Sequence, residues 1–221
     1  MASKTYVETP VIDGDGHVME DWDAVLAHMP KPYRDSGRFR GRLFPPLDHL
    51  HSANLHELVP GAFRYVTPDE WLEFMDDVGL RRAVLYTTGG LAVGKIINGD
   101  FAIAVCRAYN DWVLEEWAGA VPGRFIPMII MPLWDPRLAA QEIERCATKG
   151  AKAISFSENP SKLGLPSLHD PTNHWDPVFS AAEDADMPLC IHFGSSSSIP
   201  TTSPDAPMIV AGALAPVNLM F

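Results

Sequence analysis

A chain of 221 residues, 47% hydrophobic and 20% charged, has the composition of a globular protein with a buried core. Its formal net charge is −11 and no basic cluster occurs along it, which argues against a nucleic-acid partner and against an anionic membrane surface. Residues 1–9 lack the apolar segment of a secretory signal, and the most apolar stretches are too short to cross a bilayer, so we expect a cytoplasmic protein.

Five short apolar runs predict β-strands. Because these runs are continuous rather than alternating, we expect the strands to be buried on both faces. In chain order the predicted strands are 11–18, 82–88, 125–131, 151–157 and 188–193. Helix-start signals predict helices between them, at 67–79, from residue 100 onward, at 135–149 and at 176–187. This alternation predicts an α/β fold with a parallel sheet and right-handed crossovers.

Two long loops interrupt the alternation, residues 31–66 after the first strand and residues 157–175 after the fourth. Loops of this length in a compact domain are usually functional or disordered. Both leave the carboxyl ends of strands, where the active sites of parallel α/β folds form. We interpret 31–66 as an insertion or lid loop. In the second loop we consider Glu158, Asn159 and His169 as candidate substrate-binding residues.

The most informative short motif is Asp15-Gly16-His17, at the end of the first predicted strand. Residues two apart on a strand point to the same side, about 7 Å apart, and a carboxylate and an imidazole both suit a divalent metal. His192 lies at the end of the fifth predicted strand. In an open sheet the first and fifth strand ends can lie strands apart, whereas in a closed barrel they can meet over its axis. A barrel would therefore make Asp15, His17 and His192 three ligands of one metal site.

Two other motifs are interpreted as non-catalytic. The run Gly89–Lys95 matches most of a phosphate-binding loop, but Ile96 stands where that loop needs a hydroxyl for magnesium, so we reject nucleotide hydrolysis. The run Ser195–Ser198 has no neighbouring base in the sequence, so we interpret it as a flexible loop rather than a nucleophile elbow. The cysteines lack the spacing of a zinc finger or a disulfide framework, and we expect buried free thiols at Cys106, Cys146 and Cys190.

Four segments of the chain resemble amidohydrolase-related proteins, in the branch that includes aminocarboxymuconate semialdehyde decarboxylase. They are Ile12–His17 (IDGDGH), Leu163–Ser167 (LGLPS), Trp175–Pro177 (WDP) and Pro188–Gly194 (PLCIHFG). The resemblance spans nearly the whole chain. It implies a metal-dependent (β/α)8 TIM barrel that hydrolyses small molecules or decarboxylates them without oxidation.

The resemblance also implies specific residues. The first-strand His-x-His of the family matches Asp15-x-His17, with a carboxylate in the first position, and the fifth-strand metal histidine matches His192. The family has further catalytic or ligand residues after strands six and eight, which we expect beyond Phe221. Residues 1–221 would then form a barrel truncated after about five β/α units. One divalent cation, zinc or manganese, fits this mixed ligand set.

The resemblance leaves three functions open. The leading interpretation is an enzyme that decarboxylates a small carboxylated organic substrate at its metal. Metal-dependent hydrolysis of a C–N or C–O bond uses the same ligands. The third possibility is a catalytically inert fragment or binding subunit, because an open set of five strands exposes edges that closure hides. We expect a small-molecule substrate and, by resemblance, a homo-oligomer for the complete enzyme.

Overall fold

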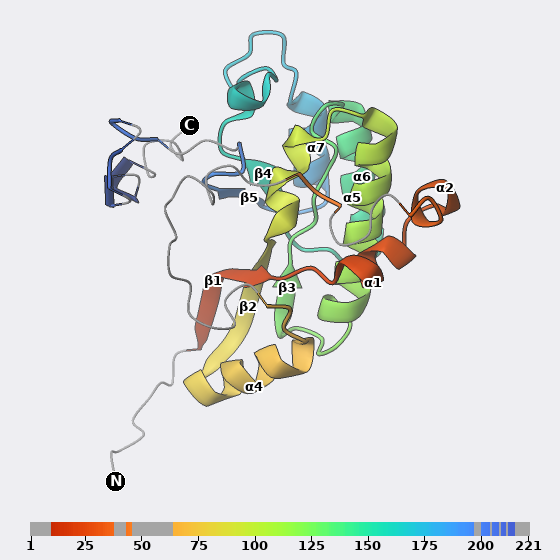
Figure 1. The fold of residues 1–221 in the computed structure, drawn as a ribbon, viewed down its shortest axis with the longest axis vertical. Helices are drawn as coiled ribbons and strands as arrows, with labels where there is room; N and C mark the ends of the chain where they lie inside the picture. The colour runs from red at the N-terminus through yellow and green to blue at the C-terminus, as the bar shows by residue number, and fades with distance from the viewer. Residues whose placement is uncertain are drawn as a thin grey trace.

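The computed structural model describes residues 10–37, 43–45, 64–196, 200–203, 205–207, 209–210 and 212–214. Strands and helices alternate along these residues (Figure 1). The strands are β1 (Val11–Val18), β2 (Leu80–Thr87), β3 (Phe125–Pro127), β4 (Ile154–Ser157) and β5 (Leu189–His192). The helices are α1 (Trp22–Ala27), α2 (Lys31–Arg34), α4 (Pro68–Val78), α5 (Gly99–Val113), α6 (Pro136–Thr148) and α7 (Asp176–Asp184). Three further helical segments are η1 (Gly89–Lys95), η2 (Leu114–Ala118) and η3 (Pro160–Leu163).

All the strand pairs are parallel, which confirms the predicted α/β architecture. One sheet has the order β1-β2-β3, the other pairs β4 with β5, and a bridge between Ile129 and Ile154 joins the two. Each strand therefore neighbours the strand that precedes it in the chain. A doubly wound sheet reverses its strand order part-way, and no reversal occurs among these five strands.

The third predicted strand changes partners along its length, which is why β3 is shorter than the predicted 125–131. Met128 still donates its backbone N–H to the carbonyl of Leu85 in β2, at 2.9 Å. Ile129 donates instead to the carbonyl of Ala153, just before β4, and its own carbonyl accepts from Ser155 at 2.8 Å. This single extended segment connects the two sheets.

Helices α4, α6 and α7 begin where the sequence predicted, and α5 begins one residue before the predicted start at Asp100. Thr67 and Glu70 form a capping box at the start of α4, each side chain bonding the backbone of the other. The Asn98 side chain accepts the N–H of Phe101 at the start of α5, and the Asp135 side chain caps α6. These local bonds satisfy N–H groups that no helical turn can reach.

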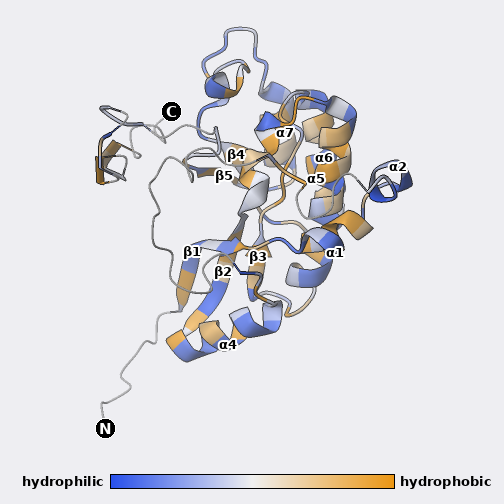
Figure 2. Ribbon diagram, in the orientation of Figure 1, coloured by the Kyte–Doolittle hydropathy of each residue, from blue (hydrophilic) through white to orange (hydrophobic). Residues whose placement is uncertain are grey.

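Helices α5, α6 and α7 lie together on one side of the strands (Figure 1). Each contains both hydrophobic and hydrophilic residues (Figure 2), and apolar residues such as Val105, Ile143 and Val178 are buried. The buried Asn110 of α5 fixes this layer to the segment that joins the sheets. Its side-chain amide donates to the carbonyl of Ile130 at 2.8 Å and accepts the N–H of Ile130 at 2.9 Å. Asn110 thereby satisfies backbone groups that have no strand partner at that point.

A charged cluster joins α5 to α6. Glu142 is only 3% exposed and accepts hydrogen bonds from Asn110 and from two nitrogens of Arg145. Arg145 and Lys149 both reach Asp111 of α5, at 2.6 and 2.7 Å. The buried carboxylate is therefore paired, as the cost of burying a charge requires.

The predicted insertion or lid loop at 31–66 is only partly described. Residues 38–42 and 46–63 lie outside the described part of the chain, so the lid stays a prediction. Helix α2 forms the beginning of the loop, and Phe44 packs on Trp22.

The cysteines are free. Cys106 and Cys146 are buried as expected, but Cys190 is partly exposed, like the other residues of β5. Within the described residues, no helix has the length and apolar character needed to span a bilayer.

We predict that Asp111→Asn destabilises the fold in a pH-dependent way. Although burial raises the pKa of Asp111, hydrogen bonds from Lys149 and Arg145 outweigh it and hold the pKa below the ordinary value of 3.8. Such a carboxylate stabilises the folded state above its unfolded-state pKa and loses this effect as the pH falls through its folded-state pKa. The free energy of unfolding should drop by up to about 1 kcal/mol at pH 7.

Urea unfolding of the wild-type and Asp111→Asn proteins, followed by circular dichroism between pH 7 and pH 3, measures this difference. We expect the two curves to converge below about pH 4. A difference that stays constant over the whole range would contradict the assignment.

Candidate metal centre

The strand β1 is irregular where the candidate ligands lie. Asp13 pairs with Ala83 and Gly16 with Leu85, so β1 contains one more residue than β2 between these points. The extra residue forms a β-bulge, within which the Asp13 side chain accepts the N–H of Asp15 at 3.0 Å. Asp13 is therefore the structural hydrogen-bond acceptor that its position suggests.

Gly16 lies at the point of closest approach between β1 and β2. A Cβ atom at this position would lie 2.9 Å from Cδ2 of Leu85 and 3.0 Å from the carbonyl oxygen of Val84. Only glycine lets the two strands meet here without displacing backbone. The bulge and this close approach together set where Asp15 and His17 point.

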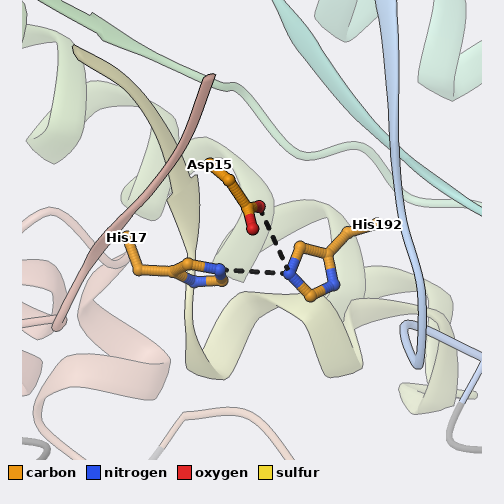
Figure 3. Close-up of side chains that lie close together, drawn as sticks. All are labelled: Asp15, His17 and His192. Atoms are coloured by element: carbon orange, nitrogen blue, oxygen red, sulfur yellow. Dashed lines mark hydrogen bonds and ion pairs between the residues drawn. The ribbon is translucent and has the colours of Figure 1, made fainter. Parts of the chain in front are cut away.

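Asp15, His17 and His192 converge on one point (Figure 3). The Nε2 atoms of His17 and His192 are 3.1 Å apart, and a carboxylate oxygen of Asp15 lies 3.9 Å from Nε2 of His192. Two nitrogens that bind one zinc ion at about 2.0–2.1 Å with tetrahedral geometry lie about 3.3 Å apart. The spacing of the imidazoles therefore fits a shared divalent cation.

This convergence requires the strands to curl. In a flat sheet, β1 and β5 would lie about 19 Å apart, because neighbouring strands are spaced by about 4.8 Å. Side chains cannot close that distance to 3.1 Å from opposite ends of a flat array. The strand order and the contact together indicate a curved arrangement of the described strands.

The Nδ1 atom of each imidazole, on the side of the ring away from the shared point, also contacts an oxygen atom. Nδ1 of His192 lies 2.7 Å from the carbonyl oxygen of Phe193, and Nδ1 of His17 lies 3.3 Å from the hydroxyl of Thr88. A carbonyl only accepts, so Nδ1 of His192 carries the proton and the neutral ring presents a lone pair at Nε2. This is the usual outer contact of a metal-binding histidine.

The electrostatic surroundings favour neutral imidazole. Burial lowers the pKa of His17, and the neighbouring His192 lowers it further, while the charges of Asp15 and Asp13 act in the opposite direction. Neutral imidazole is the form that binds a metal. Asp15 is 80% exposed and supplies the negative charge on the solvent side of the cluster.

Tyr86 forms a wall of the site that the sequence did not single out. It pairs in register with His17, and its ring centroid lies 5.7 Å from that of His17 and 4.9 Å from that of His192. Burial, with smaller contributions from Cys190 and Asp15, raises the pKa of Tyr86 to about 12. The phenol therefore stays protonated at neutral pH. Its place at the carboxyl end of the second predicted strand was the signal available in the sequence.

The glycine-rich run after β2 binds a carboxylate from its own chain. Glu20, 6% exposed, accepts the backbone N–H groups of Thr88, Gly89 and Gly90 at 3.0–3.1 Å, and the hydroxyl of Thr87. Burial raises the pKa of Glu20, and these hydrogen bonds act against that effect. We call this set of hydrogen-bond donors around Glu20 the carboxylate cradle. The glycine-rich run that resembled a phosphate-binding loop thus binds a side chain of the protein, in agreement with the rejection of nucleotide hydrolysis.

A second buried carboxylate organises the loop after β5. Glu158 is 4% exposed and accepts the N–H of Gly194 at 2.7 Å, the N–H of Ser196 at 3.0 Å and the hydroxyls of Ser195 and Ser196. Both serines are buried, so the expectation of a flexible loop is wrong for these two residues. Carboxylate hydrogen bonds that span 36 to 38 residues of sequence order them.

The three candidate substrate-binding residues lie outside the metal-ligand cluster. The carboxylate of Glu158 is engaged inside the protein, the side chain of Asn159 accepts the hydroxyl of Ser161, and His169 is exposed. All three follow β4 in the chain, and Glu158 and Asn159 do so directly, at the carboxyl end of the strand. Their role in substrate binding stays a prediction.

Comparison with known proteins identifies the family of the chain. A family model described as Amidohydrolase matches residues 12–217. A gamma-resorcylate decarboxylase of Polaromonas is 30% identical over 128 residues, which make up 56% of this chain and 38% of the relative. The chain therefore aligns with well under half of that relative.

Solved structures show the same fold at low sequence identity. A 5-carboxyvanillate decarboxylase from Novosphingobium aromaticivorans, in complex with manganese, superposes with a TM-score of 0.62 at 23% identity, covering 92% of this chain and 54% of that one. A 2,6-dihydroxybenzoate decarboxylase from Rhizobium gives a TM-score of 0.56 at 21% identity, covering 96% and 61%.

We predict that Gly90→Ala disrupts the carboxylate cradle. A Cβ atom at Gly90 would lie 2.2 Å from Oγ1 of Thr87, a buried group that also bonds Glu20. We expect a loss of about 1–3 kcal/mol in the free energy of unfolding, as overpacking in a tight site usually costs. Gly99→Ala is the matched control, because a Cβ there meets nothing within 4 Å and alanine favours the helix. Chemical denaturation of both variants decides: equal stability in the two would contradict the prediction.

Proposed function

Because the chain belongs to the amidohydrolase family, we propose that it holds one divalent cation and takes part in the non-oxidative decarboxylation of a small carboxylated aromatic compound. The observation that carries this proposal is the convergence of Asp15, His17 and His192 from β1 and β5. The relatives named above are decarboxylases of hydroxylated aromatic acids, which favours this reaction over others in the family.

The proposal includes the architecture. We propose that the five described strands are the first five of a (β/α)8 barrel. The consecutive strand order and the contact between the ends of β1 and β5 support this arrangement. In such a barrel the candidate ligands lie at the carboxyl ends of strands, where barrel enzymes hold their active sites.

The residues present fit a divalent cation. Asp15 would bind through a carboxylate oxygen, and His17 and His192 through Nε2. These oxygen and nitrogen donors suit manganese and zinc alike, and a solved relative contains manganese. When bound, the cation would supply positive charge to the oxygens of the substrate.

Tyr86 would orient an aromatic substrate. The buried ring of Tyr86 offers a flat apolar wall next to the imidazoles, and its protonated phenol adds no negative charge. Decarboxylation replaces the bond from ring carbon to carboxylate with a carbon–hydrogen bond, so it consumes one proton and releases carbon dioxide. The general acid that delivers this proton stays a prediction of the family resemblance.

Product analysis separates the three candidate functions. We expect a manganese-loaded protein that also contains the family's residues after strands six and eight, given 2,6-dihydroxybenzoate, to release carbon dioxide and form resorcinol in equal amounts. Incorporation of labelled oxygen from water without carbon dioxide, with amide or ester substrates, would support hydrolysis instead. Absence of any product at full manganese occupancy would support the inert or binding role. Mass spectrometry of the products and carbon dioxide detection give the readout.

We predict that His192→Ala weakens manganese binding by at least about 100-fold, because it removes a ligand rather than an outer contact. His169→Ala is the matched control: this histidine is exposed and lies outside the cluster, so the affinity should not change. Isothermal titration of the metal-free proteins with manganese chloride measures both. Equal affinities for His192→Ala and wild type would remove His192 from the site.

A further inference from the structure

We propose that the buried glutamates Glu20 and Glu158 are positioning residues of the metal centre, each orienting one imidazole through the loop that it binds. Glu20 acts on His17 through Thr88, and Glu158 acts on His192 through the peptide that joins Phe193 to Gly194. The link to metal binding rests on the proposed function. The orientation of the two rings does not, because it is a property of the chain alone.

The two glutamates occupy equivalent places in the fold. Glu20 follows β1 and binds backbone N–H groups of the loop after β2, and Glu158 follows β4 and binds those of the loop after β5. Each carboxylate thus fastens the carboxyl ends of two neighbouring strands. His17 and His192 also lie at the carboxyl ends of their strands, so the hydrogen bonds of each glutamate lie next to a candidate ligand.

Glu158 is linked to His192 by hydrogen bonds on either side of one rigid peptide group. The N–H of Gly194 donates to Glu158 at 2.7 Å, and the carbonyl of Phe193 accepts from Nδ1 of His192 at 2.7 Å. That N–H and that carbonyl belong to the same planar unit and point in opposite directions. Fixing the N–H with a buried carboxylate therefore fixes the carbonyl, which sets the ring plane of His192 and keeps its lone pair at Nε2.

Glu20 is linked to His17 through one residue, Thr88. Thr88 donates its backbone N–H to Glu20 at 3.0 Å, and its hydroxyl lies 3.3 Å from Nδ1 of His17. A hydroxyl both donates and accepts, so Thr88 can hold either tautomer of the ring. With the lone pair of His192 at Nε2, a hydrogen bond across the 3.1 Å contact places the proton at Nε2 of His17.

Glu158 has no acceptor site left for a substrate. A carboxylate offers about four lone-pair positions. One oxygen accepts from the N–H of Gly194 and the hydroxyl of Ser196, and the other accepts from the N–H of Ser196 and the hydroxyl of Ser195. With 4% of the residue exposed, Glu158 fits a positioning role better than the substrate-binding role that its loop suggested.

The test compares Glu20→Gln and Glu158→Gln with Glu142→Gln. Glutamine keeps the volume, but its NH2 group cannot accept from an N–H, so part of each cradle is lost. Glu142 is equally buried and bonded but fastens α5 to α6 and reaches neither imidazole, which makes it the matched control. Long-range 15N–1H NMR spectra of the metal-free proteins report the tautomer of each histidine, and titration with manganese chloride reports affinity.

We expect Glu158→Gln to convert His192 from a single Nδ1–H form to a tautomer mixture with little effect on His17, and Glu20→Gln to affect His17 in preference to His192. Each should weaken manganese binding by about tenfold. Glu142→Gln should lower the melting temperature and leave both tautomers and the affinity unchanged. If a glutamine variant does not fold, Thr88→Val, which removes only the hydroxyl, should change the spectrum of His17 alone.

Unchanged tautomers in the two site variants, or an equal loss of affinity in Glu142→Gln, would overturn the positioning role. A wild-type chain that binds no manganese would overturn the proposed metal centre instead. The imidazole spectra would still decide whether the glutamates orient the rings, so the two failures are distinguishable.

Discussion

Contact between imidazoles on the first and fifth strands is possible only if the strands between them curl. The curl depends on the segment at Met128 and Ile129, which leaves β2 and joins β4 through backbone hydrogen bonds. Asn110 supports that segment from α5 by satisfying the backbone of Ile130. The geometry of the candidate metal centre therefore depends on a buried amide in α5, a helix that contains none of the ligands.

Buried carboxylates at the strand ends are the second constraint. Removing Glu20 and Glu158 from water has an energetic cost, which only a complete set of hydrogen-bond donors offsets. Both carboxylates receive such a set, from backbone N–H groups and hydroxyls at the end of the neighbouring strand and in the loop after it. Burying the two carboxylates lowers the stability of the fold, but because their donors have fixed positions, the hydrogen bonds hold each loop in one conformation at the edge where the imidazoles lie.

Sequence patterns predicted the parts of this structure that depend on local chemistry. The first strand matched residues 11–18, the helix starts followed their capping residues, and strand-end position singled out Asp15, His17 and His192. The partner change at Met128 was missed because it depends on which strands lie on either side. The roles of Glu20 and Glu158 were missed for the same reason, since their hydrogen bonds cross 36 to 70 residues of chain. Ser195 and Ser196 have a loop-like composition, yet a distant carboxylate orders them.

The bulge in β1 has a consequence for how the site tolerates change. Along a strand the side chains alternate, so the number of residues between two points decides which face each one meets. The bulge absorbs the additional residue between Asp13 and Gly16, so Gly16 and His17 still pair with Leu85 and Tyr86. A residue added between the bulge and His17 would not be absorbed in this way, and it would turn the imidazole to the opposite face while leaving the composition almost unaltered. In this stretch, chain length is as strict a requirement as the identity of the ligands.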